Sequence, residues 1–126
     1  MTRFKQSVLS FDEIKNEAVA EWGALQNSKK PRIYVGTATC GRAAGAMAVL
    51  EAINKEISAS GIDAIVMQVG CIGFCYAEPL VDIVKPGRPR ISYGSVTPEM
   101  VTQLIRDYLV SDNPHPEWAQ IGRAHV

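Results

Sequence analysis

The sequence predicts an α/β sandwich in which helices cover a four-stranded mixed sheet. A helical segment at about 41–60 separates two strand-like segments, 32–35 and 62–69, and this order favours a parallel strand pair. Two further apolar runs, 80–84 and 90–93, flank a turn rich in proline and glycine, which predicts an antiparallel hairpin beside that pair.

The composition is that of one globular domain. The chain has 126 residues, of which 47% are hydrophobic and 21% charged, and its formal net charge is zero. No basic face for nucleic acid is indicated, and no apolar run is long enough to insert in a membrane. Because the first ten residues also lack the apolar core of a signal peptide, we expect a cytoplasmic protein.

The first helix is predicted at about 11–25, as an N-terminal extension spanning residues 1–30. Ser10 and Glu13 form a capping box at its start. Its apolar side chains recur at helical spacing and need a partner; they are Phe11, Ile14, Ala18 and Trp22.

The central domain is predicted at residues 31–110. In the helix at 41–60 the buried stripe is expected to include Ala43, Met47, Leu50, either Ile53 or Asn54, and Ile57. Segment 62–69 is nearly all apolar, as in a strand covered on both faces. Thr97 as cap and Pro98 at the first helical position open a last helix, whose apolar side chains are Val101, Leu104, Ile105 and Tyr108. The order α, β, α, β, β, β, α is typical of a thioredoxin-like sandwich with an extra N-terminal helix.

Residues 111–126 are predicted to be a linker and an artefactual tail. The last six residues, 121–126, match what one frame of a widely used sequencing-library adapter encodes. We expect that the natural chain was cut near Gln120 and continued beyond it, the alternative being a genuine tail.

Three cysteines form the candidate site. Cys40 follows the first strand near a helix N-terminus, where a thiolate is favoured, and Cys71 follows the second strand. Since parallel strands end at the same edge, we expect the two loops to converge. Cys75 follows Cys71 by four positions, with Gly70 and Gly73 leaving the backbone free to curl, so this loop is a two-sulfur chelate. Thiolates from two loops are what an iron-sulfur cluster requires.

Four other interpretations of these motifs agree less well with the sequence. If the cysteines were only small buried apolar residues, their position in glycine-rich loops would be unexplained. A P-loop would need a lysine and a hydroxyl where Arg42 and Ala43 stand. A thiol-disulfide oxidoreductase normally has C-x-x-C, one residue shorter than the spacing here. Zinc prefers four N or S ligands, and the two histidines, His115 and His125, lie in the linker and the tail.

Several motifs together resemble the thioredoxin-like 2Fe-2S ferredoxin family. In particular, they resemble the domain that begins the NADH-oxidising flavoprotein subunit of bacterial NAD-linked hydrogenases, formate dehydrogenases and their complex I relatives. The resemblance covers about residues 10–109. The matching residues are Gly36, Thr37, Cys40, Val69, Gly70, Cys71, Gly73, Cys75, Pro79, Tyr93, Gly94, Val96, Pro98 and Glu99.

The resemblance implies a cluster held by a C-x4-C pair and a C-x3-C pair. Cys40, Cys71 and Cys75 match three of these ligands, and the first falls on Val35, which cannot ligate iron. A water, a nearby hydroxyl of Thr37 or Thr39, or a partner protein would then supply the fourth ligand. Restoring a cysteine by Val35→Cys is expected to raise cluster occupancy.

The implied function is one-electron transfer through a 2Fe-2S cluster. The parent subunit would oxidise NADH or reduce NAD through FMN, with 4Fe-4S clusters in the remainder, and would assemble with other subunits of a redox complex, including a small iron-sulfur subunit. The alternative is a docking domain that keeps the thioredoxin-like fold and binds no cluster.

Overall fold

The computed structural model describes residues 10–122. The helices are α1 (Phe11–Gln26), α2 (Thr39–Ala43), α3 (Ala46–Ser60) and α4 (Pro98–Leu104), which continues as a π-helix, Ile105–Val110. The strands are β1 (Arg32–Gly36), β2 (Ile65–Val69), β3 (Val81–Val84), β4 (Ile91–Tyr93) and β5 (Ala119–Ile121). Short 3₁₀ turns occupy Cys75–Ala77 and Pro116–Trp118. Within the described residues, no helix is both long enough and apolar enough to cross a membrane.

The strands form one mixed sheet in the order β2-β1-β3-β4-β5. β1 and β2 are parallel, and β3 and β4 form an antiparallel hairpin, so both predicted pairings are confirmed. The predicted number of strands was short by one, because β5 pairs with β4 from within the segment predicted as a linker. A three-residue strand beside prolines has no periodicity of its own and forms through its tertiary partners.

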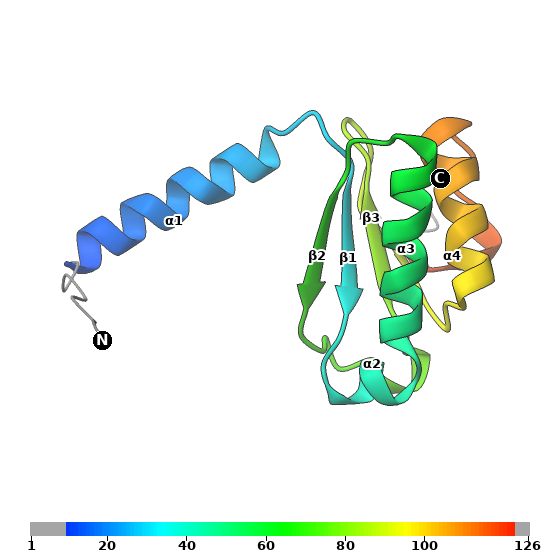
Figure 1. Ribbon diagram of the computed structural model, residues 1–126. Helices are drawn as coiled ribbons and strands as arrows, with labels where there is room; N and C mark the ends of the chain where they lie inside the picture. The colour runs from blue at the N-terminus through cyan, green and yellow to red at the C-terminus, as the bar shows by residue number, and fades with distance from the viewer. Residues whose placement is uncertain (1–9, 123–126) are drawn as a thin grey trace, which may run out of the picture.

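Helices α3 and α4 lie side by side on one face of the sheet, and the core lies between these layers (Figure 1). Its fully buried side chains include Ile33 and Val35 of β1, Ile83 of β3 and Ile53 of α3. The predicted stripe of the last helix is also buried, and Thr97 caps that helix by accepting a hydrogen bond from the Met100 amide at 3.2 Å.

The segment predicted as one helix at 41–60 is two helices. Gly45 has a φ of 103°, a left-handed conformation that interrupts the helix between α2 and α3. This break changes which residues face the core. Met47 and Ala43 are exposed, and Ala46, Val49, Leu50 and Ile53 are buried.

Strand β2 is an edge strand, which corrects the expectation that both its faces are covered. Four of its residues are partly exposed and Gln68 is exposed, and among the described strands its single neighbour is β1. An almost continuous apolar run does not distinguish an edge strand from a central one, because strand order is set by the rest of the fold.

Helix α1 extends away from the sheet (Figure 1). The capping box is confirmed, since the Ser10 hydroxyl accepts from the Glu13 amide at 3.3 Å and the Glu13 carboxylate accepts from the Ser10 amide at 2.7 Å. None of its residues is buried, and Phe11 and Trp22 are 77% and 61% exposed. The apolar stripe of α1 therefore has no covering partner within the described residues.

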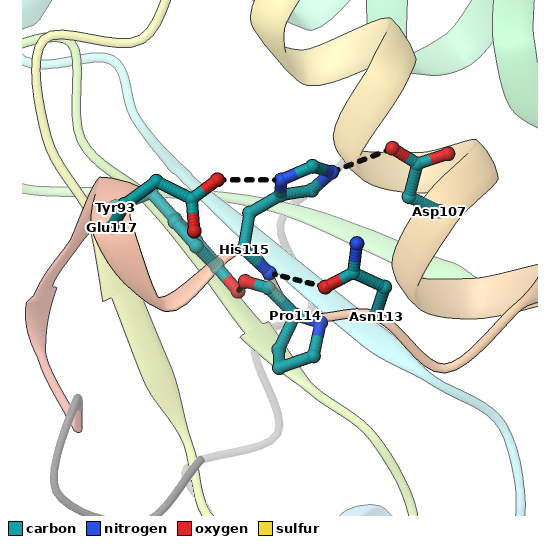
Figure 2. A network of polar contacts seen from close by, with 6 residues as sticks. All are labelled: Tyr93, Asp107, Asn113, Pro114, His115 and Glu117. Carbon is teal, nitrogen blue, oxygen red and sulfur yellow. Dashed lines mark hydrogen bonds and ion pairs between the residues drawn. The ribbon is translucent and has the colours of Figure 1, made fainter.

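His115 links the segment after the π-helix to the rest of the domain by side-chain contacts (Figure 2). The His115 ring contacts Asp107 through Nε2 at 2.5 Å and Glu117 through Nδ1 at 2.8 Å, and it stacks on Trp118. Tyr93 of β4 donates its hydroxyl to the Pro114 carbonyl at 2.5 Å. This part of the predicted linker is thus an ordered edge of the sheet. Residues 123–126 of the predicted tail lie outside the described residues.

Candidate metal centre

The loops that carry the cysteines follow the carboxyl ends of the parallel strands β1 and β2, so they leave the sheet at the same edge, as predicted. Gly36, the last residue of β1, is paired with Val69, the last residue of β2. The pairing continues one residue further, where the Thr37 amide donates to the Val69 carbonyl at 3.0 Å. All three cysteines are free and exposed beyond this edge.

Cys71 and Cys75 form a close pair. Their Sγ atoms lie 3.4 Å apart. Two sulfurs on one tetrahedral metal ion with bonds of about 2.3 Å would be about 3.8 Å apart. The Gly73 amide donates to Cys71 Sγ at 3.2 Å, and Gly73 has a φ of 94°, a conformation that glycine adopts without strain. The second loop is therefore shaped as a chelate for one metal ion.

Cys40 lies in the first turn of α2, on a loop with almost no free space. A Cβ atom at Gly41 would lie 2.1 Å from the Gly36 carbonyl oxygen, so a side chain is excluded there. Arg42, at the P-loop lysine position, donates from Nε to the Thr37 carbonyl at 2.8 Å and closes the loop. These contacts hold Cys40 in a defined place beside β1.

Glu78 is a residue of this region that the sequence interpretation missed. It is 7% exposed, and its Oε2 accepts from the Leu80 amide at 2.9 Å. A Cβ atom built at Gly36 would lie 3.2 Å from Glu78 Oε2, and one at Gly41 would lie 3.3 Å from it, so the carboxylate packs against both glycines of the Cys40 loop. Glu78 therefore joins the Cys75 loop to the Cys40 loop. The one signal in the sequence that could have indicated a role for Glu78 is its position as a carboxylate inside an otherwise apolar run. The Glu78–Pro79 peptide bond is cis.

The cysteines of this site supply some, but not all, of the ligands that a 2Fe-2S cluster requires. Cys71 and Cys75 suit one iron, whereas a cluster with two irons requires four protein ligands. Among the described residues, no three histidine, cysteine, aspartate or glutamate side chains lie close enough together to hold a metal ion. The loops meet at one edge, but the structure does not bring Cys40 into a metal-holding group with the pair.

The side chain of Val35 lies in the core. It is fully buried, on a strand paired with β2 and β3, whereas the three cysteines are exposed. The burial of Val35 argues against the expectation that Val35→Cys raises cluster occupancy, which a measurement of iron content tests. A thiol at this position would lie under α3, because Val35 shares the helix-covered face of β1 with Ile33.

Comparison with known proteins identifies a relative of similar length. No protein-family model matches the chain. The subunit HndB of the NADP-reducing hydrogenase of Solidesulfovibrio fructosivorans is 32% identical over 111 residues, which are 86% of this chain and 87% of HndB.

Two solved structures of a thioredoxin-like [2Fe-2S] ferredoxin from Aquifex aeolicus share the fold. The wild-type crystal structure matches with a TM-score of 0.61 and 18% identity, over 74% of this chain and 98% of the ferredoxin. The other structure matches with a TM-score of 0.59 and 19% identity, over 73% and 91%. The predicted thioredoxin-like fold is thereby confirmed, and the sequence match shows that the chain belongs to the family of the hydrogenase subunit HndB.

Proposed function

We propose that this chain is an electron-transfer domain of a hydrogenase complex, with a 2Fe-2S cluster on Cys40, Cys71 and Cys75. The observation that carries the proposal is the Cys71–Cys75 pair, whose sulfurs lie 3.4 Å apart on a glycine loop beside the Cys40 loop. A bound 2Fe-2S cluster supplies one-electron reduction and oxidation.

The roles of the chain's own residues follow from their contacts. Cys71 and Cys75 would hold one iron, and the Gly73 amide, which donates to Cys71 Sγ, would stabilise negative charge on that sulfur. Cys40 would offer one ligand to the second iron. The fourth ligand would come from a water, from a threonine hydroxyl (Thr37 or Thr39), or from a partner subunit.

The names of the relatives support this assignment. HndB is a subunit of an NADP-reducing hydrogenase, and the fold neighbours are named [2Fe-2S] ferredoxins. We therefore propose that the partners are other subunits of a redox complex in the cytoplasm, including a small iron-sulfur subunit. NAD, FMN and 4Fe-4S sites would lie outside the residues described above.

A cysteine variant tests the assignment. Protein purified without oxygen is assayed for iron per chain as the wild type, as Cys71→Ser and as Tyr76→Phe. Tyr76 lies in the same loop and is 83% exposed, so its variant is a matched control. We expect Cys71→Ser to lose most of the iron and Tyr76→Phe to retain it. Equal iron in all three proteins would refute the assignment.

A docking domain without a cluster is the second candidate. It is favoured by the incomplete donor group among the described residues and by the exposed apolar side chains of α1. A folded, iron-free protein that still binds its partner subunit would support this candidate against the first.

A further inference from the structure

A basic pocket lies at the end of the sheet opposite the cysteine loops. It has a volume of about 440 Å³ and is formed by the end of α1, the start of β1 and the turn between β3 and β4. The volume is within the range of small-molecule sites. The cations that line it, which define the basic pocket, are Lys30, Arg32, Lys85, Arg88 and Arg90.

The carboxylates of the described residues neutralise these cations incompletely. Asp112 contacts both Lys85, at 2.7 Å, and Arg88. Asp82 contacts Arg90 at 2.7 Å, and Asp63 contacts Lys30 at 3.2 Å. Three carboxylates therefore serve five cations, and the basic pocket keeps an excess of positive charge.

Among the described residues, Arg32 is the one cation of the basic pocket that has no carboxylate partner. It is 8% exposed, and within residues 10–122 its side chain makes one hydrogen bond, from Nη1 to the Tyr34 hydroxyl at 3.2 Å. The Arg90 guanidinium lies 4.4 Å from the centre of the Tyr34 ring, so two cations flank the Tyr34 side chain. Burying a guanidinium without a counter-ion costs free energy, and a bound anion would offset that cost.

We propose that the basic pocket binds the phosphate groups of a small molecule. A guanidinium presents paired N–H donors that match the oxygens of a phosphate, and Arg32, Arg88 and Arg90 bring three such groups to one pocket. The excess charge favours a multiply charged phosphate over a single carboxylate. Trp22, 61% exposed, lines the same pocket and offers an aromatic face to a group attached to the phosphate.

This site is independent of the proposed cluster. Arg32 begins β1 and Gly36 ends it, so the strand separates the basic pocket from the cysteine edge. Phosphate binding and iron content are therefore separate measurements, and either proposal can fail without the other.

The test is calorimetric titration of the full chain with inorganic pyrophosphate and, separately, with adenosine diphosphate. Arg32→Gln removes the buried cation of the basic pocket. Arg88→Gln removes an exposed cation, and this substitution does not alter the core. Lys55→Gln, on the exposed side of α3, removes the same charge away from the basic pocket and is the matched control.

We expect saturable binding of pyrophosphate that is weakened about tenfold or more by Arg32→Gln and also weakened by Arg88→Gln. Lys55→Gln should leave the affinity unchanged. Tighter binding of adenosine diphosphate, lost in Trp22→Ala, would identify a nucleotide, and equal binding of both probes would identify the phosphate alone. The proposal is overturned if neither probe binds saturably, if neither pocket variant weakens binding, or if Lys55→Gln weakens it equally.

Discussion

Gly41 shows how one residue without a side chain positions a candidate ligand. The space that a Cβ would need is filled by the Gly36 carbonyl oxygen, 2.1 Å away, and by Glu78 Oε2 at 3.3 Å. Gly41 lies in helix α2, directly after Cys40. Tight packing of backbone on backbone therefore sets where the backbone of Cys40 lies.

We predict that Gly41→Ala lowers the free energy of unfolding by about 2 kcal/mol, because the loop must move to admit the methyl group. Gly23→Ala is the matched control, since a Cβ at Gly23 meets no atom within 4 Å and alanine favours the exposed helix. Urea unfolding of both variants measures the effect. Equal stability of the two variants would show that the loop is not tightly packed.

Val35 gives a second test at the level of one side chain. Because Val35 is fully buried, a thiol in Val35→Cys should be protected from reagent in the folded, iron-free protein and react after denaturation. The three natural cysteines, all exposed, should react in the folded state and serve as internal controls. We also expect iron content equal to that of the wild type. Rapid labelling of a fourth thiol in the folded protein would contradict the assignment of Val35 to the core.

Among the elements, α1 contributes nothing to the core, although its end lines the basic pocket. It has no buried residue, so its removal exposes little apolar surface of the sheet and its helices. We predict that deleting residues 1–26 leaves the thermal midpoint of the sheet domain within about 2 °C of the wild type. Circular dichroism of both proteins checks this, with the loss of α1 visible as reduced helix signal. A large fall in the midpoint would mean that α1 packs on the domain.

The C-terminal segment is predicted to make stability depend on pH. Burial alone would lower the pKa of His115, but its contacts with Asp107 and Glu117 outweigh burial and raise the pKa above the usual 6.5. A raised folded-state pKa stabilises the protein below the unfolded value, and the contribution is lost as pH rises through the folded value. The free energy of unfolding should therefore fall as pH rises from about 6.5 through the folded pKa.

Urea unfolding between pH 5.5 and 8.5 measures this dependence, and His115→Gln should flatten it. Asp112, the other acid of this segment that contacts cations, has a pKa lowered by Lys85 and Arg88, so it does not titrate in that range. An unchanged slope in His115→Gln would show that another group is responsible.

For the whole molecule, local signals predicted the elements and tertiary contacts decided the rest. The capping box at Ser10 and the cap at Thr97 are encoded by neighbouring residues, and both were predicted correctly. The break at Gly45 and the pairing of β5 were not predicted, because a glycine is tolerated within many helices and a three-residue strand depends on its partner. The shared edge of the cysteine loops followed from the parallel strands. The burial of Glu78 between them did not, since it depends on a close approach of two distant segments.

The central claim is that this domain carries electrons on a cluster held by its cysteines. Its most direct test is the iron and acid-labile sulfide content per chain, with an electron paramagnetic resonance spectrum of the reduced protein, after purification without oxygen. We predict about two irons and two sulfides per chain and a 2Fe-2S signal. A folded protein that contains neither iron nor sulfide, and whose three thiols all titrate as free, would contradict the claim.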